Sequence, residues 1–195
     1  MQSNSPCVST RSTVEDGFRA AEWRILPRRR MPPTLYVEAV ALCSEAYEED
    51  YAAQMDEHGA DSVHLLGFEN GGLVTHALWV PCSVEAGTGT PMRAACVEAL
   101  ATRPARQGRG LGSAATRRLV EEIATAGFDL AVLWASNIGW YTRLGWERWR
   151  GPVSQRRDGI IEPLPDDDVM IHRLPRTPAL DPAAPLLITG EAQGR

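Results

Sequence analysis

The pattern of apolar and polar positions predicts a chain that alternates between strands and helices. The first 20 residues are polar, lack periodicity and are expected to form a flexible lead-in. Alternation around Trp23 and Ile25 predicts a strand near 21–28. A helix is expected to begin at Pro32-Pro33 and run to about residue 46, followed by a short second helix that ends near Met55.

The middle of the chain carries the clearest signals. Two apolar runs flank Asn70-Gly71-Gly72 and predict a hairpin. Leu111, Ala115, Leu119 and Ile123 line one face of an amphipathic helix that Gly127 ends. The remaining expected elements are strands at 92–102, 130–134, 146–149 and 169–174, a short helix at 137–144, a polar loop at 151–168 and a poorly ordered tail from Pro175.

A length of 195 residues fits one domain of the α/β or α+β class. We therefore expect a flexible N-terminal lead-in over 1–20, one domain over 21–175 and a Pro/Ala-rich C-terminal tail over 176–195. An internal repeat is not evident.

Composition excludes several functions. The net charge of −5 argues against broad nucleic-acid binding. The chain contains no lysine, which excludes Schiff-base and Walker-type chemistry. Its four cysteines are scattered, so a disulfide framework or a metal site is not expected, and a reducing cytoplasm is the default. Neither a signal peptide nor an apolar stretch of about 20 residues is evident, so no membrane partner is expected.

A glycine-rich loop between the expected strand at 92–102 and the amphipathic helix is the most informative feature. Glycines 108, 110 and 112 let the backbone approach a ligand closely, and the following helix presents its unpaired N–H groups. A diphosphate suits such an anion site. The alternatives are a turn that binds nothing, or a dinucleotide-binding loop, which matches less well because G-x-G-x-x-G is absent.

The loop sequence QGRGLG resembles the Q/R-x-x-G-x-G/A signature of the GNAT (GCN5-related) N-acetyltransferases. The resemblance implies a GNAT fold: a mixed, mostly antiparallel central sheet, helices on both faces, and a cleft for acetyl-CoA where two strands splay apart. It also implies that acetyl-CoA is bound by the following residues: Leu100, Ala101, Thr102, Gln107, Gly108, Arg109, Gly110, Leu111, Gly112 and Ser113.

A closer resemblance, over about 35–174, is to the aminoglycoside 2′-N-acetyltransferases. It rests on CVEALAT, RQGRGLGSA, WYTRLGWERWRGPVS and PLPDDDVMIHRLP. The resemblance implies direct acetyl transfer in a ternary complex, without a metal. Glu98 would accept the proton of the amine, the Leu100 N–H would polarise the thioester carbonyl, and Tyr141 would protonate the leaving thiolate. On this basis, Glu98→Ala should depress turnover most at low pH.

The acceptor side should be acidic if the substrate is a cationic small molecule such as an aminoglycoside. The resemblance places Asp50, Glu98, Ala99, Asp166 and Asp167 there. Three consecutive aspartates at 166–168 repel one another, and a bound cation would relieve this repulsion. Trp134 could stack on a sugar or pack in the core.

Other interpretations remain open. The chain could acetylate another polyamine-like compound, or it could be an inactive acyl-CoA-binding or drug-binding module. Glu98 and Tyr141 favour an enzyme. The four histidines have no partner at catalytic spacing, and structural roles are expected for them; Cys96 is expected to be a small core residue. A homodimer is possible.

Overall fold

A computed structural model describes residues 21–164 and 168–190. The strands join in one mixed sheet with the order β6-β9-β5-β4-β3-β10-β7-β8, and β1 and β2 extend from β3. The elements are β1 (Glu22–Pro27), η1 (Arg28–Arg30), α1 (Pro33–Tyr47), α2 (Ala52–Glu57), β2 (Val63–Glu69), β3 (Gly72–Ala86), β4 (Met92–Thr102), η2 (Pro104–Arg106), α3 (Leu111–Thr125), β5 (Leu130–Trp134), α4 (Ile138–Thr142), β6 (Glu147–Arg148), β7 (Val153–Arg157), β8 (Ile160–Pro163), β9 (Val169–Arg173) and β10 (Leu186–Gly190).

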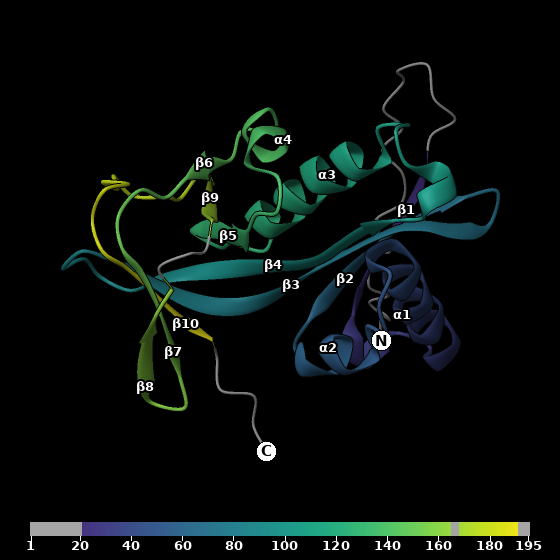
Figure 1. The fold of residues 1–195 in the computed structure, drawn as a ribbon, viewed down its shortest axis with the longest axis horizontal. Coiled ribbons are helices and arrows are strands. Elements are labelled where there is room, and N and C mark those ends of the chain that lie inside the picture. The colour runs from purple at the N-terminus through teal and green to yellow at the C-terminus, as the bar shows by residue number, and fades with distance from the viewer. Residues whose placement is uncertain (1–20, 165–167, 191–195) are drawn as a thin grey trace, which may run out of the picture.

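The expected fold class is confirmed. Only β4–β5 and β10–β7 pair in parallel, and every other pairing of the described strands is antiparallel. Helices α1 and α2 lie on one side of the sheet, and α3 and α4 lie on the other (Figure 1). The sheet is therefore covered on both faces, as the resemblance implies.

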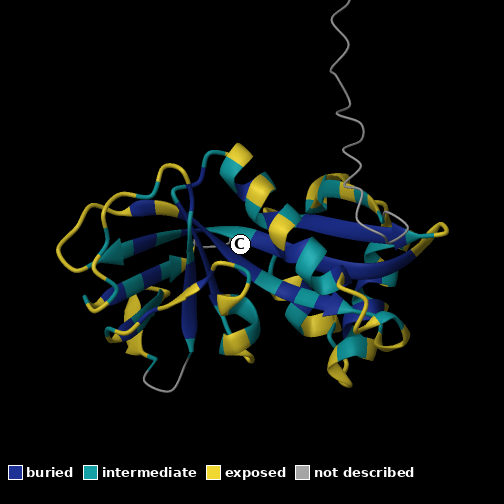
Figure 2. Ribbon diagram, turned by 90° about the horizontal axis from the view of Figure 1, so that it is seen from above, coloured by how far each residue is buried: buried dark blue, intermediate teal, exposed yellow. Residues whose placement is uncertain are grey.

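Side-chain alternation along the long strands assigns neighbouring residues to opposite cores. Ala77 and Trp79 of β3 pack with α3, whereas Leu78 between them packs with α1. The central strands are accordingly buried, while the helices carry exposed turns on their outer sides (Figure 2). A rigid two-sided core thus supports the middle of β4.

Two sequence predictions are wrong in the C-terminal part of the chain, after residue 150. The expected polar loop over 151–168 contains a hairpin, β7–β8, whose turn is formed by Asp158 and Gly159, both with positive φ. The expected tail contains β10, which pairs with β3 and β7. Because β2 covers β3 only as far as Trp79, β10 pairs with the remaining edge of β3 from Cys82 onward.

The segment before β10 is held by hydrogen bonds to residues 149–152. Arg150 N and Gly151 N donate to Pro182 O at 2.8 and 3.0 Å, and the Trp149 indole N–H donates to Ala184 O at 2.8 Å. This close approach needs a glycine, because a Cβ at Gly151 would lie 2.0 Å from Ala184 O. The C-terminal segment is therefore part of the packed domain.

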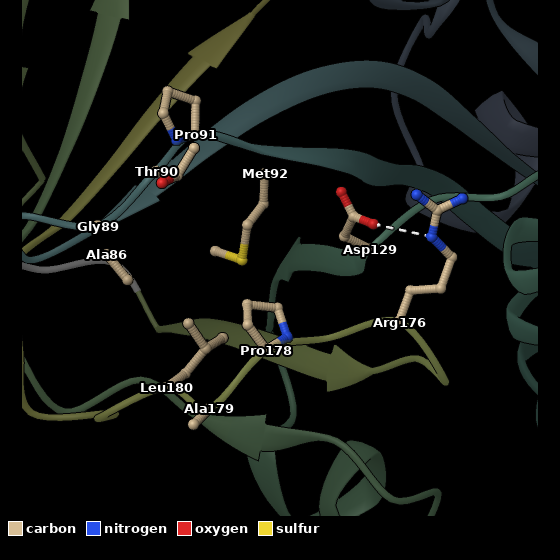
Figure 3. Close-up of a pocket in the computed structure, with 10 residues that line it drawn as sticks. All are labelled: Ala86, Gly89, Thr90, Pro91, Met92, Asp129, Arg176, Pro178, Ala179 and Leu180. Atoms are coloured by element: carbon tan, nitrogen blue, oxygen red, sulfur yellow. Dashed lines mark ion pairs between the residues drawn. The ribbon is translucent and has the colours of Figure 1, made fainter.

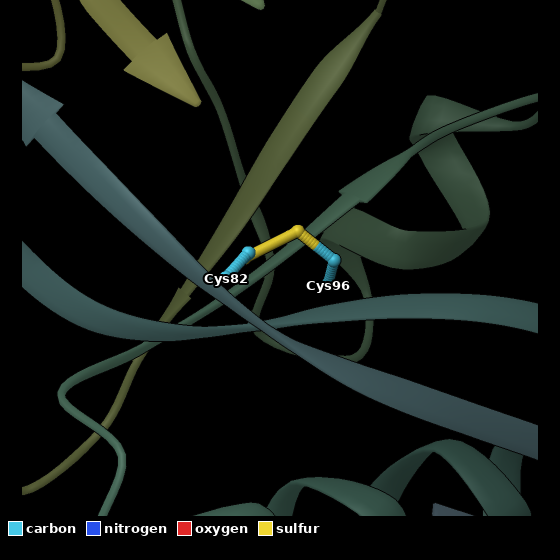
Figure 4. Close-up of a disulfide and its surroundings, with 2 residues drawn as sticks. All are labelled: Cys82 and Cys96. Carbon is cyan, nitrogen blue, oxygen red and sulfur yellow. A yellow bond between two sulfur atoms is a disulfide. The ribbon is translucent and has the colours of Figure 1, made fainter. Parts of the chain in front are cut away.

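The cysteine expectation is also corrected. Cys82 of β3 and Cys96 of β4 form a disulfide (Figure 4). They look isolated in the sequence, 14 residues apart, but the β3–β4 hairpin places Val80 opposite Cys96 and Cys82 opposite Ala94. The two cysteines therefore lie diagonally across one strand pair. Cys43 is a buried free thiol.

We predict that Gly151→Ala lowers the free energy of unfolding by about 1–3 kcal/mol, because the added methyl overlaps a backbone carbonyl that the chain must move. Urea denaturation followed by tryptophan fluorescence measures the change. Gly190→Ala is the control: a Cβ there has no neighbour within 4 Å, and we expect a change within about 0.5 kcal/mol. Equal denaturation midpoints for the two variants would contradict this docking of the C-terminal segment.

Candidate active site

Strands β4 and β5 separate partway along their length. They pair only from Ala94 to Cys96 of β4, opposite Leu130 to Val132 of β5. Beyond this point β4 continues along β3 to Thr102, whereas β5 continues along β9 to Trp134. The expected splayed strands are thus present, and one edge of β4 from Val97 to Thr102 is not paired with β5.

A β-bulge lies in the unpaired part of β4. Leu78 of β3 pairs with Glu98 and His76 pairs with Ala101, so Ala99 and Leu100 together oppose Ala77. Ala99 has φ 51°, a left-handed conformation that L-residues rarely adopt. As a result, Ala99 packs on the α1 side of the sheet and Leu100 packs on the α3 side.

Glu98 is half-buried at the start of the bulge. Burial raises the pKa of its carboxyl to about 7. Because its neighbour Val97 packs on the α3 side, alternation directs Glu98 toward the α1 side. The Glu98 carboxyl therefore titrates near neutral pH.

The charge of this carboxyl acts on three tyrosines. Tyr141 of α4 stacks edge-on with Trp140 and Trp146, and burial followed by the charge of Glu98 raises its pKa to about 12. Burial and, more weakly, Glu98 also raise the pKa values of Tyr47 and Tyr51. All three phenols therefore keep their protons at neutral pH. The Tyr47 hydroxyl donates to Leu100 O at 2.9 Å.

Neither Tyr47 nor Tyr51 is among the site residues expected from the sequence. Both flank the acidic run that drew attention to Asp50, and their rings lie 5.0 Å apart. Asp50 itself is exposed, and its carboxylate accepts a hydrogen bond from Ala52 N at 3.1 Å. This hydrogen bond lies at the start of α2, whose N-cap residue is Tyr51. Tyr47 and Tyr51 interact electrostatically with Glu98.

The remaining acceptor residues expected from the sequence are Trp134, Asp166 and Asp167. Trp134 is half-buried at the end of β5, where it packs against the core cluster around Val132 and Val169. Asp166 and Asp167 lie outside the described residues. The third aspartate of that run, Asp168, forms an ion pair with Arg148 at 2.5 Å, so part of the charge repulsion is already relieved within the chain.

The glycine loop joins the end of β4 to α3. Gln107 donates from its side-chain amide to Thr102 O at 3.1 Å, which ties the loop to the strand. Gly108 and Gly110 have φ of 74° and 78°, and a Cβ at either would meet no atom within 4 Å, so conformation rather than space requires glycine there. Gly112 has closer surroundings: a Cβ there would lie 3.6 Å from Thr102 Oγ1 and 3.6 Å from the Trp140 ring.

The N-terminus of α3 fits an anion. Gly110 provides no side-chain cap, and the first turn contains no acidic residue. The first intrahelical bond into the turn runs from Ala114 N to Gly110 O, which leaves the amides of Leu111, Gly112 and Ser113 directed out of the helix end. These amides, with the helix dipole, would hold a diphosphate.

A groove lies away from Glu98 and the glycine loop (Figure 3). It is lined by Met92 at the start of β4, by Leu180 and by the Arg176–Asp129 ion pair at 3.2 Å. Met92 precedes Glu98 by six residues on one strand, which corresponds to about 20 Å. The groove therefore does not contribute to the chemistry around Glu98.

A family model described as an acetyltransferase (GNAT) domain matches residues 28–149, well over half of the chain. The chain belongs to the GNAT acetyltransferase family. This GNAT protein is 32% identical over 133 residues to the aminoglycoside 2′-N-acetyltransferase of Mycolicibacterium fortuitum, covering 67% of each chain.

Solved structures agree with the fold. An Escherichia coli GNAT family N-acetyltransferase in complex with CoA superposes with a TM-score of 0.65 at 18% identity, covering 93% of this chain and 95% of that one. A Brucella melitensis GNAT acetyltransferase with acetyl-CoA gives 0.57 at 18% identity, covering 88% and 97%. The match to Eis1 of Mycobacterium abscessus gives 0.57 at 21% identity and covers 69% of this chain but 33% of that one.

No helix within the described residues is long and apolar enough to span a membrane.

We predict that Gly110→Ala weakens CoA binding roughly tenfold, equivalent to about 1.4 kcal/mol. An alanine at φ 78° is strained and shifts the amides at the start of α3. Isothermal titration calorimetry with CoA measures the affinity. Gly71→Ala is a matched control, because Gly71 has φ 81° and equally open surroundings but lies in the β2–β3 turn. If both variants bound CoA as tightly as the wild type, the loop would not be the diphosphate site.

Proposed function

We propose that this GNAT protein acetylates the 2′-amine of an aminoglycoside, in a ternary complex with acetyl-CoA. The observation that carries the proposal is the half-buried Glu98, whose carboxyl has a pKa raised to about 7 at the point where β4 separates from β5. The 32% identical relative is named for this activity. The acidic balance of the chain, −5, favours a cationic acceptor.

The glycine loop, the start of α3 and the end of β4 would bind acetyl-CoA. Acetyl-CoA, when bound, supplies an activated acetyl thioester. The amides at the start of α3 and the glycine loop would hold its diphosphate, and the segment from Leu100 to Thr102 would lie along its arm. The sheet edge left free of β5 is rigid on its other side through β3, so the bound molecule would be positioned precisely enough for transfer.

Proton movements are assigned to two side chains. The carboxylate of Glu98 would accept a proton from the ammonium of the acceptor, because only the neutral amine is nucleophilic. The phenol of Tyr141, which keeps its proton at neutral pH, would donate to the departing thiolate. The Leu100 N–H would donate to the thioester carbonyl oxygen as charge develops there.

The acceptor side would be formed by the α1–α2 region. Tyr47 and Tyr51 present aromatic faces near Glu98, and such faces attract ammonium groups and stack on sugars. Asp50 would add a negative charge at the rim, where it is exposed. Asp166 and Asp167 remain candidate ligands from the sequence alone.

The first test is a thiol-release assay with acetyl-CoA across a panel of aminoglycosides and linear polyamines. We expect CoA release with aminoglycosides that carry a 2′-amine, with little release for analogues that carry a 2′-hydroxyl, and NMR of the product should place the acetyl group on the 2′ nitrogen. Transfer to polyamines only would identify a different acceptor class. CoA binding without transfer to any amine would identify an inactive binding module.

The second test is the pH dependence of Glu98→Gln. In the free wild-type enzyme the carboxyl loses its proton as pH rises through about 7, so kcat/KM should rise with pH up to that value. The variant should be slower by roughly 10²-fold above pH 7 and should lack the inflection near 7, leaving only that of the amine. The raised pKa reverses the sequence-based expectation that loss of Glu98 matters most at low pH, because there the carboxyl is itself protonated. An unchanged inflection in the variant would remove Glu98 from the mechanism.

A further inference from the structure

The carbonyl groups of the β4 bulge are bound by side chains from outside β4. His76 Nδ1 lies 2.9 Å from Ala99 O, and the Tyr47 hydroxyl donates to Leu100 O. A bulge disrupts the ladder between strands, and its buried polar groups then need other partners. His76 is on the adjacent strand β3 and Tyr47 is on α1. The bulge is therefore tied to two separate elements.

His76 is the inner end of a buried polar chain. His76 Nε2 lies 2.9 Å from His64 Nδ1, and His64 Nε2 lies 3.1 Å from Ser62 Oγ. The side chain of Ser62 also bonds to Gly59 O at 2.8 Å. All three polar residues are at most 1% exposed. Burial lowers the pKa of His64 to about 3 and that of His76 to about 4, so both imidazoles are neutral near pH 7.

Counting protons restricts the tautomers of this chain. It contains four contacts, from Gly59 O through Ser62, His64 and His76 to Ala99 O. The hydroxyl and the two neutral rings supply one proton each, so one contact lacks a proton. Gly59 O also accepts a hydrogen bond from Ser62 N, at 3.4 Å, so it keeps a donor when the Ser62 hydroxyl donates to His64 instead.

Ala99 O has a weaker alternative. The Cys43 thiol is its other neighbour: Sγ lies 4.0 Å from Ala99 O and 3.5 Å from His76 Nδ1, so in the opposite tautomer the thiol would donate to Nδ1. In that tautomer the lone pairs of Nδ1 and Ala99 O would face each other at 2.9 Å, and Ala99 O would lose its close donor. The favoured arrangement therefore has Ser62 donating to His64, His64 Nδ1–H donating to His76 Nε2, and His76 Nδ1–H donating to Ala99 O. His64 fixes the tautomer that His76 needs in order to bind the bulge.

We infer that His76 is a positioning residue for acetyl transfer: through Ala99 O it fixes the bulge that places the Glu98 carboxyl and the Leu100 amide, and His64 holds His76 in the required tautomer. The inference rests on the proposed function, in which these two groups act on the amine and the thioester. Displacement of reacting groups by about 1 Å can lower the rate ~10²-fold. A hydrogen bond from His76 to the backbone of the bulge can therefore affect turnover although His76 does not contact a substrate.

Two amide variants test the inference. In His76→Asn the side-chain N–H₂ reaches the Nδ1 position and can still donate to Ala99 O, whereas in His76→Gln it reaches the Nε2 position, toward His64. Each variant buries one neutral amide, so they are matched in chemistry and differ in reach. We expect His76→Asn to retain kcat within a few-fold and His76→Gln to lose roughly 10- to 100-fold, with the Kd for CoA unchanged in both.

Two measurements on the protein itself do not depend on activity. In ¹⁵N–¹H spectra, the Leu100 amide should shift in His76→Gln more than in His76→Asn. In the wild type, long-range ¹H–¹⁵N correlations should show both His64 and His76 protonated at Nδ1, a result that needs no variant to fold. If the protein showed these signals but did not acetylate aminoglycosides, the proposed function would be refuted, whereas the anchoring of the bulge by His76 would still hold.

The inference is overturned by any of three results. The first is a wild-type spectrum in which His76 carries its proton on Nε2. The second is equal kcat for the two variants at equal unfolding free energy, because a merely structural histidine would not distinguish them by reach. The third is a Leu100 amide that does not respond to His76→Gln.

Discussion

The separation of β4 from β5 after Cys96 is the constraint on which the rest of the site depends. A strand paired on both sides presents no backbone groups to a ligand, and an unpaired strand lacks rigidity. Here β4 keeps its pairing with β3 as far as Thr102 while losing β5 after Cys96. The chain thus obtains a free backbone edge on a firmly held element, and the bulge, Glu98 and the glycine loop all lie on this edge or directly after it.

Under the proposed function, the two faces of the sheet correspond to a diphosphate side and an acceptor side. Helix α3 lies on one face and α1 and α2 lie on the other (Figure 1). The N-terminus of α3 has amides suited to an anion, whereas Tyr47 at the end of α1 and Tyr51 before α2 interact electrostatically with Glu98. The bulge connects the two sides, because it turns Ala99 toward α1 and Leu100 toward α3. A regular strand would place Ala99 on the α3 side instead, since neighbouring residues alternate between faces. In the proposed mechanism, the one-residue irregularity thus puts the groups that would act on two different substrates within a single short segment.

Local patterns in the sequence predict local structure well, and long-range pairing poorly. The strand at 92–102 and the helix opened by Gly110 carry their own signals, in β-forming residues and in helical periodicity, and both match β4 and α3. The β7–β8 turn has an Asp158-Gly159 signal, but its strands are polar and were interpreted as a loop. The strand β10 exists because β3 offers an edge beyond Trp79, which depends on where β2 ends. The Cys82–Cys96 pair depends on register in the same way.

Within the site, too, residues in a contiguous motif could be predicted from the sequence, whereas residues that act through contacts between distant positions could not. The glycine loop is a contiguous motif, and its conformation follows from residue type at Gly108 and Gly110. The roles of His64 and His76 depend instead on contacts with Ser62 and Ala99, which lie up to 23 residues away in the sequence. A histidine with no partner at catalytic spacing is therefore not necessarily without a role, because spacing along the chain does not describe neighbours across strands.

The burial of Glu98 shows what the site costs the fold. The folded chain keeps this proton up to about pH 7, whereas the unfolded chain releases it near 4.5, so the folded state binds more protons between these values. Stability contributed by this group therefore falls as pH rises from 4.5 to 7, by up to about 3 kcal/mol above pH 7. A glutamine would avoid this cost, because its amide does not titrate. A carboxyl that destabilises the fold under neutral conditions, beside a backbone held in a left-handed conformation at Ala99, is consistent with the proposed proton transfer.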